Sequence, residues 1–257
     1  MLSPKRTALI VASTAALALA NSAHAADWTD FIYAGYGTGY QYSQLNAHIP
    51  AYSYNTKGDF DSEFKPTSSA WLNNLFFGVG NQATNGWYWG IELNANYANN
   101  TGFDEQDDHY ADNFDNYVAH RVNISLDWSV DVDALFGHTL DEQNKWLGYV
   151  KVGPSIAEVK ATYKAYDQQS EAGMSYGNLR TDKTSKDIYG ALIGLGLRYQ
   201  LDPHWVAGLE GDFTYYPTQT VKSDSDFSDG TGVHSTSMKY GFKPLVYAIK
   251  ATIAYRF

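Results

Sequence analysis

The sequence predicts an all-β fold, an eight-stranded antiparallel up-and-down transmembrane β-barrel. Three observations support this prediction. Apolar and polar residues alternate over stretches of 11 to 13 residues, aromatic rings gather at the ends of these stretches, and short connections alternate with long ones. The stretches are longer than an ordinary strand of about 5 to 6 residues. They match the roughly 9 to 11 residues with which a tilted strand crosses a bilayer.

The composition of the 257-residue chain excludes several other classes of protein. The absence of cysteine excludes disulfide-stapled scaffolds, thiol enzymes and cysteine-ligated metal sites. A net charge of −10 argues against nucleic acid as a partner. Charged residues make up 18% of the chain, below the roughly 25% that is usual in soluble domains. This balance, together with 21 tyrosines, is unusual for a cytosolic enzyme.

The first 25 residues have the pattern of an export signal. Lys5 and Arg6 precede an apolar stretch of 13 residues, 8–20, which is shorter than the roughly 20 residues of a spanning helix. The cleavage signature consists of Ala23 and Ala25, with Ala26 as the first mature residue. We therefore expect a cleaved signal peptide in 1–25 and one barrel domain in 26–257, with four long extracellular loops.

Period-two alternation locates the strands. In the stretch from Tyr189 to Leu201, for example, Ile193 and Leu195 share one phase while Gly194 and Arg198 share the other. The strong stretches are Trp87–Tyr97, Val118–Val130, Tyr189–Leu201, Trp205–Tyr215 and Leu245–Phe257, and the weaker ones are 31–43, 70–81 and 146–165. The phases of 31–43 and 146–165 stay open, because glycines blur the first and a Gly-Pro pair interrupts the second.

The polar phase contains too many charges for the core of a water-soluble sandwich, because an unpaired buried charge is costly. In a membrane barrel the apolar phase faces lipid and the polar phase faces the interior. Eight strands leave an interior just wide enough for side chains to fill, so we expect a structural plug of ion pairs, with a narrow ion path as the alternative. The predicted interior charge network is Glu92, Arg121, Asp127, Lys151, Arg198, Glu210, Asp212, Lys250 and Arg256.

Connection lengths give the orientation, because outer-membrane barrels have short periplasmic turns and long extracellular loops. The three short connections are Ala83–Gly86, Gly137–Lys145 and Asp202–His204. The four long ones are Leu45–Ser69, Asn99–Asp115, Asp167–Lys186 and Pro217–Lys243. Seven connections require eight strands with both termini on the periplasmic side. Ten strands stay possible if Gly173–Thr181 or part of the first loop pairs as an additional hairpin.

The end of the chain carries the resemblance to a known class. Ile253, Tyr255 and Phe257 continue an alternation that ends on a terminal phenylalanine. This ending resembles the C-terminal signal that the barrel-assembly machinery reads in bacterial outer-membrane proteins. With its length and strand number, the mature chain is similar to the small barrels of the OmpA transmembrane domain, OmpX and opacity-type adhesins. The resemblance implies location in the bacterial outer membrane and contact with its lipid and lipopolysaccharide.

Two further features are candidates for chemical sites. The second loop is acidic, and carboxylates suit Ca²⁺ or Mg²⁺, but the spacing matches no ordered calcium loop. We expect a solvated acidic loop made of Asp104, Glu105, Asp107, Asp108, Asp112 and Asp115. His109 lies among these carboxylates and His234 precedes Ser235, yet neither is part of a recognisable hydrolytic motif. We expect no catalytic residues, no metal and no cofactor.

The sequence therefore predicts a non-enzymatic outer-membrane surface protein with an envelope-stabilising or adhesive role, whose charge-filled barrel anchors exposed loops. A host or surface ligand bound through these loops is a possible partner. The alternatives are a small ion or solute channel and a hydrolase acting on lipid A or peptides.

Overall fold

The computed structural model describes residues 29–51, 60–64, 67–98, 101–109, 116–169, 175–176, 180–228 and 233–257. The predicted signal peptide and its cleavage residues, Ala23, Ala25 and Ala26, lie outside these ranges. Over the described ranges, no helix combines the length and apolar character that crossing a membrane requires.

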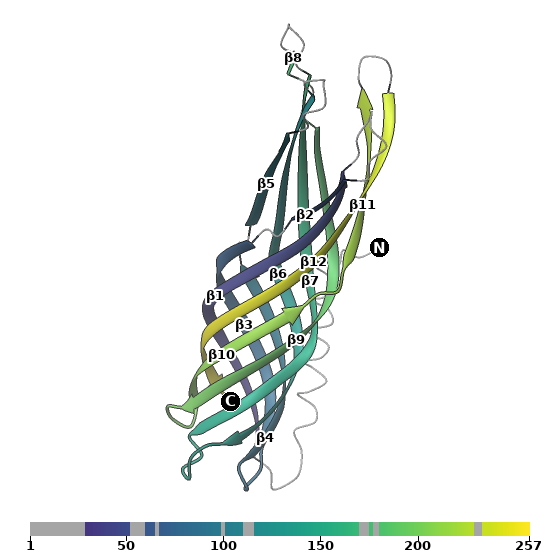
Figure 1. The fold of residues 1–257 in the computed structure, drawn as a ribbon. Helices are drawn as coiled ribbons and strands as arrows, with labels where there is room; N and C mark the ends of the chain where they lie inside the picture. Colours follow the sequence, from purple (N-terminus) through teal and green to yellow (C-terminus); the bar gives the residue numbers. More distant parts are fainter. Residues whose placement is uncertain are drawn as a thin grey trace.

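Eight strands form a closed antiparallel barrel (Figure 1). In order around the ring they are β1 (Thr29–Ala51), β3 (Thr67–Gln82), β4 (Trp87–Ala98), β6 (Asn116–Thr139), β7 (Trp146–Gln169), β9 (Arg180–Gln200), β10 (Trp205–Tyr215) and β12 (Val233–Arg256). Each strand pairs with its neighbour in the sequence of this list, and β12 pairs with β1 from Tyr33↔Arg256 to His48↔Gly241. Closure removes the free sheet edges. The predicted fold class is confirmed.

Four further strands extend the wall of the barrel outside this ring: β2 (Phe60–Phe64), β5 (Thr101–His109), β8 (Ser175–Tyr176) and β11 (Gln219–Ser228). They pair with the far ends of β1, β6, β7 and β12, respectively. The four long connections, predicted from the sequence as loops, therefore contain β-structure. The reason is physical: these segments have no lipid to face, so their side chains show no apolar phase.

The strands that carry these hairpins are longer than a membrane crossing requires. β6, β7 and β12 each have 24 residues. At a rise of about 3.4 Å per residue such a strand extends roughly 80 Å, whereas a tilted strand crosses a bilayer in about 9 to 11 residues. The wall therefore continues well beyond the membrane at the end that carries the long hairpins (Figure 1).

The opposite end is closed by the three short turns that the sequence predicts. Between β3 and β4, the Gly86 amide donates to the Ala83 carbonyl at 2.9 Å, and Gly86 has a φ of 86°. This left-handed conformation favours glycine because it has no Cβ. In the turn between β9 and β10, the backbone amides of His204 and Trp205 donate to the Asp202 carboxylate at 2.7 and 2.8 Å. Such side-chain bonds fix short hairpin turns.

The outer face of the barrel is apolar, as the alternation predicts. Leu195 and Ile249 leave 68% and 64% of their surface exposed. Aromatic rings flank this band at both ends, with Trp87, Trp89, Trp146 and Trp205 toward the short turns and Trp71, Tyr97, Tyr189 and Tyr215 toward the hairpins. Two aromatic girdles around an apolar band are typical of barrels in the bacterial outer membrane. The chain is located in that membrane.

The structure shows which side chains face the interior in the two stretches whose phase the sequence left open, 31–43 and 146–165. In β1, Tyr33 is buried inside while Tyr36 and Tyr40 are exposed on the outer face. In β7, Lys151 is buried inside while Val150 is exposed outside. Gly153 and Pro154 of β7 continue the strand, since Gly153 pairs with Leu192 and Pro154 with Ala191 of β9.

The predicted direction of the side chains is wrong in the part of β6 that precedes Asp127. A β-bulge at Asp127 shifts the register, so that Leu126 pairs with Val159 while Trp128 pairs with Glu158. The alternation predicts that Leu126 faces lipid, but it is buried, as is Val159. A bulge inserts one unpaired residue and thereby moves the preceding side chains to the other face. The sequence alternates on both sides of Asp127, so this reversal leaves no interruption in the pattern.

Candidate functional site: the charged barrel interior

A network of buried polar side chains crosses the barrel interior, and all eight strands of the ring contribute to it. One member from each strand, in order around the ring, is Tyr33, Asn74, Glu92, Asp133, Lys151, Arg198, Glu210 and Lys250. Each of these side chains is almost entirely buried. Period-two alternation explains the arrangement, since residues two apart on a strand point to the same face.

Glu210 lies at the centre of the network. Its two carboxylate oxygens accept from three cationic side chains: Arg198 at 3.1 Å, Lys151 at 3.1 Å and Lys250 at 3.3 Å. The Tyr149 hydroxyl also donates to this carboxylate. Asp212, two residues further along β10, contacts Lys151 at 3.0 Å and Lys250 at 2.9 Å. β10 therefore supplies two carboxylates to Lys250 on the neighbouring strand β12 and to Lys151 on β7, beyond β9.

Arg198 connects this group to the opposite side of the barrel. Its guanidinium donates to Glu92 at 2.6 Å, and the Tyr33 hydroxyl donates to the same Glu92 oxygen at 2.9 Å. The guanidinium also lies over the rings of Tyr149 and Tyr33, at 4.7 and 5.0 Å from their centroids. Arginine suits this position because its planar group both stacks on aromatic faces and forms several charge-assisted hydrogen bonds.

A ladder of asparagines extends from the ion pairs toward the hairpin end of the interior. Asn94 donates to Glu92 at 3.1 Å and to Asp133 at 3.0 Å. Asn96 donates to Asp131 at 2.6 Å. Asn74, on the neighbouring strand, donates to both Asn94 and Asn96. An amide side chain has two donors and an acceptor, so these residues satisfy carboxylates without adding charge.

Carboxyl groups outnumber cations among the described members of the network. Five carboxyl groups, Glu92, Asp131, Asp133, Glu210 and Asp212, face three cations, Lys151, Arg198 and Lys250. Within the described residues, Asp131 forms no ion pair, and one oxygen of Asp131 and one of Asp133 accept no hydrogen bond. Asp133 lies opposite Glu92 of β4, and Asp131 lies opposite Asn94, two residues nearer the hairpin end.

Glycines lie directly across the strand pairs from the charged members of this network. Glu92 faces Gly78, Arg198 faces Gly208, Glu210 faces Gly196 and Lys250 faces Gly39. Both Lys151 and Asp212 face Gly194. A Cβ added at Gly194 would lie 2.8 Å from Lys151 Cε. The absent side chains leave the volume that the long charged side chains and the tyrosine rings occupy.

The structure brings six of the nine predicted network residues together: Glu92, Lys151, Arg198, Glu210, Asp212 and Lys250. Asp127 does not join them, and its assignment to the interior is wrong. It occupies the bulge and pairs with Lys160 at 2.7 Å, where that lysine is 47% exposed. Arg256 lies at the short-turn end of the interior over the Phe31 ring. The backbone of Arg121 pairs with Glu105 and Lys164, and its side chain lies outside the described residues.

The sequence pattern does not reveal several members of the network. Asp131 and Asp133 follow the predicted strand end at Val130, although the alternation of Val132 and Phe136 continues past it. Tyr33 and Tyr149 belong to the two stretches with open phases. The missed signal is the glycine pattern, because glycines such as Gly78 and Gly196 lie next to the buried rings of Tyr33 and Tyr149.

The other predicted site residues are placed as follows. Ile253 and Phe257 are exposed on the outer face, and the Phe257 amide donates to the Ile32 carbonyl at 2.9 Å. Their role as an assembly signal stays a prediction. Asp104, Glu105, Asp107 and Asp108 of the acidic segment lie on β5, with side chains outside the described set, while Asp112 and Asp115 are outside the described ranges.

The carboxylates of the interior are turned toward cationic and neutral donors of the same network. Across the described part of the chain, no group of three or more His, Cys, Asp or Glu side chains is arranged to hold a metal ion. The donors include lysine, arginine, tyrosine and asparagine side chains. Such a densely connected set resists rearrangement, because removing one partner leaves a buried charge uncompensated.

Comparison with known proteins gives similarity at the level of solved structures. No protein-family model and no curated protein sequence matches the chain. The outer-membrane protease OmpT of Escherichia coli aligns with 92% of this chain and 100% of its own, at 8% identity and a TM-score of 0.48. The attachment invasion locus protein Ail of Yersinia pestis, solved with the heparin analogue sucrose octasulfate, aligns with 88% of this chain and 99% of its own, at 13% identity and a TM-score of 0.32. The N-terminal β-barrel domain of Pseudomonas aeruginosa OprF aligns with 87% and 99%, at 10% identity and a TM-score of 0.31.

Proposed function

We propose that the protein is a non-enzymatic surface protein of the outer membrane, whose sealed barrel anchors extended β-hairpins outside the cell in an envelope-stabilising or adhesive role. The observation that carries this proposal is the buried network to which all eight strands contribute. An interior filled by connected ion pairs favours a rigid anchor over an open pore.

The extended hairpins support the surface role. The strand pairs β1–β2, β5–β6 and β11–β12 continue the antiparallel ladder past the outer aromatic girdle. A ladder of this kind holds its tip at a fixed distance from the membrane, because each backbone group on the paired side is hydrogen-bonded. Rigid presentation reduces the entropy lost when a partner binds at the tip.

Outward-facing lysines near the outer girdle support the envelope role. Lys183 is exposed, and Lys243 lies 5.0 Å from the centroid of the Tyr215 ring. A cation beside an interfacial tyrosine suits the phosphate layer of lipopolysaccharide. We therefore take lipopolysaccharide as a partner of the outer wall and the barrel-assembly machinery as the partner of the C-terminal strand. Protein or glycan ligands belong to the hairpin tips.

Conductance measurement tests the sealed interior. The full mature chain is refolded into planar lipid bilayers and its current is recorded under an applied voltage. We expect no steady single-channel current from the wild type. A double variant that shortens two members of the network, Lys151→Ala with Glu210→Ala, removes opposite charges together and is expected to open measurable current. Steady wild-type conductance well above the lipid background would instead support the channel alternative.

Two assays on whole cells test the surface role. Cells that express the full chain are compared with cells whose β11–β12 hairpin is replaced by a four-residue turn, with heat-modifiable migration in gels as the control for folding. We expect the replacement to reduce binding to surfaces or detergent resistance while the barrel stays intact. Mass spectrometry of lipid A and surface peptides tests the hydrolase alternative. New acyl or peptide products that require the protein would overturn the non-enzymatic proposal.

A further inference from the structure

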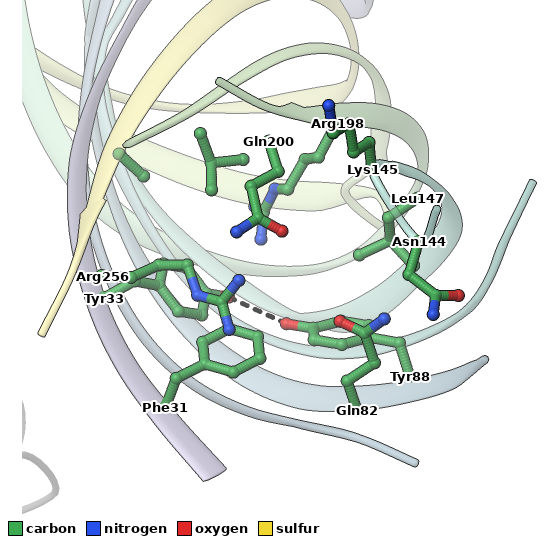
Figure 2. Close-up of a pocket in the computed structure, with 12 residues that line it drawn as sticks. Phe31, Tyr33, Gln82, Tyr88, Asn144, Lys145, Leu147, Arg198, Gln200 and Arg256 are labelled. Atoms are coloured by element: carbon green, nitrogen blue, oxygen red, sulfur yellow. Dashed lines mark hydrogen bonds between the residues drawn. The ribbon is translucent and has the colours of Figure 1, made fainter. Parts of the chain in front are cut away.

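A small cavity lies at the short-turn end of the barrel interior, and Figure 2 shows the residues that line it. Its volume is about 40 Å³, which is enough for roughly three water molecules. Tyr33, Tyr88 and Arg198 line it together with Asn144 and Lys145 from the β6–β7 turn. The cavity therefore faces the periplasm.

The polar lining of this cavity is cationic. Lys145, Arg198 and Arg256 line it, and none of the twelve described lining residues is acidic. Arg198 is already compensated by Glu92 and Glu210. Within the described part of the chain, Lys145 and Arg256 form no ion pair. The cavity thus presents two positive charges whose compensation does not come from the described wall.

The Arg256 guanidinium is held in place by its surroundings. It lies 3.8 Å from the centroid of the Phe31 ring. Figure 2 shows the two side chains beside each other. The Arg256 amide donates to the His204 carbonyl at 2.7 Å, which fixes its backbone to the β9–β10 turn. Stacking leaves the edge of a guanidinium, with its planar donors, available for a carboxylate or a phosphate.

Neutral groups complete the lining. Tyr88 is fully buried, and its hydroxyl lies 3.4 Å from that of Tyr33. Gln200 adds a side-chain amide, while Leu147 and Val206 add apolar surface. Small-molecule sites commonly combine an apolar lining with a few polar groups that fix orientation. Here those polar groups and cations favour a small anionic group attached to a short apolar part.

We propose that this cavity is a periplasmic binding site for the anionic group of a small molecule, a carboxylate or a phosphate. Arg256 provides the main contact, and Lys145, on an exposed turn, provides the second positive charge. The site is separate from the hairpin tips and does not depend on the surface role proposed above. Its size admits the anionic group itself, so the remainder of the ligand extends into the periplasm.

Calorimetric titration of the refolded full mature chain in detergent micelles tests this site. Inorganic phosphate and N-acetylglycine serve as the two probes, at constant ionic strength with chloride as the background anion. We expect saturable binding in the millimolar range for at least one of them. Tighter binding of N-acetylglycine indicates a carboxylate ligand, and tighter binding of phosphate indicates a phosphate ligand. The absence of saturable binding for both probes would overturn the proposal.

Three variants localise the binding. Arg256→Gln is expected to weaken it at least 10-fold and Lys145→Gln about 3-fold, whereas Arg256→Lys restores part of the affinity because it retains the charge. Lys186→Gln, at an exposed lysine near the hairpin end of β9, is the matched control at the opposite end of the molecule and leaves the affinity unchanged. Refolding from denaturant avoids the assembly machinery, and Lys145 lies outside the terminal strand, so the test does not depend on Arg256 alone. Equal affinity in wild type, Arg256→Gln and Lys145→Gln would place the binding elsewhere.

Discussion

Glu210 and Arg198 are joined at 3.1 Å, although they do not face each other across the β9–β10 pair. Glu210 faces Gly196, and Arg198 faces Gly208. Each charged side chain therefore extends diagonally over a glycine on the neighbouring strand to reach its partner. The wall of the barrel and its ion network are complementary in shape.

Replacing Glu210 with glutamine is expected to lower the free energy of unfolding by about 3 to 5 kcal/mol, because a buried pair that loses one partner leaves its cations uncompensated. Glu210 contacts Arg198, Lys151 and Lys250. Unfolding by guanidinium in lipid vesicles, followed by tryptophan fluorescence, measures this loss.

The matched control for that change is Asp131→Asn. Asp131 is equally buried but forms no ion pair with any described residue. Its asparagine keeps an acceptor for Asn96 and removes one charge from the carboxyl excess, so the expected change is below about 1 kcal/mol. Equal destabilisation by the two substitutions would show that burial of the carboxyl, rather than its ion pairs, sets the stability.

Adding a methyl group at Gly196 is expected to destabilise the barrel by about 1 to 3 kcal/mol through overpacking. A Cβ at this position would overlap the Tyr149 ring inside the barrel. Gly211, on the adjacent strand, has open space around it, because no described atom lies within 4 Å of the position that a Cβ would occupy. Gly211→Ala is therefore the control and leaves stability unchanged or slightly raised. The same unfolding assay in vesicles compares the two variants. An unchanged free energy of unfolding in Gly196→Ala would contradict the proposal that this glycine leaves room for the Tyr149 ring.

Leu195→Arg is expected to lower the free energy of unfolding by about 2 to 4 kcal/mol, because Leu195 faces the lipid near the middle of the apolar band. Its side chain is 68% exposed on the outer face. Leu201, at the start of the β9–β10 turn, is also exposed, but arginine there lies at the interface and costs about 0 to 1 kcal/mol. Refolding yield and unfolding free energy in vesicles measure both variants. Equal tolerance at the two positions would contradict the assigned position of the membrane.

The Asp202 carboxylate is expected to titrate below the ordinary range of an aspartate. Backbone amides of His204 and Trp205 donate to it and lower the pKa of Asp202. Because the pKa is lower in the folded turn than in the unfolded chain, the carboxylate stabilises the turn above the unfolded pKa. This contribution is lost as the pH falls through the folded pKa. An NMR titration of the carboxyl carbon in micelles measures it, with Asp202→Asn as the assignment control. A midpoint at or above the value of an aspartate in an unfolded peptide would contradict the turn geometry.

Much of the ring was predictable because lipid imposes a pattern on the strands that cross it. Outward residues such as Leu195, Leu209 and Ile249 occupy one phase of their stretches, and the three short turns were located from Gly86, Asp202 and the polar segment near Lys145. The inward direction of Arg198, Glu210, Asp212 and Lys250 was predicted from the alternate phase of the same stretches. Period two is sufficient wherever one face meets hydrocarbon and the other does not.

The remaining features left no such pattern. β5 and β11 lie beyond the membrane, so both of their faces meet polar surroundings and nothing distinguishes them from loop. The bulge at Asp127 reverses the facing of Leu126 while the alternation continues in the sequence. Tyr88 and Tyr149 resemble girdle tyrosines by residue type, yet they lie inside because glycines at Gly80 and Gly196 make room for their rings.

Participation of every strand in the central network constrains how the protein enters the membrane. Tyr33 belongs to the first strand and Lys250 to the last, and these strands become neighbours only when the cylinder seals. Before the sheet closes, its lysines and carboxylates lack some of their ion-pair partners and are exposed to the lipid tails. Inserting the hairpins one after another would therefore be energetically unfavourable, because the charged side chains of each hairpin would lack their partners. Insertion and sealing are expected to be a single concerted event, with water retained inside the curling sheet until the last seam forms.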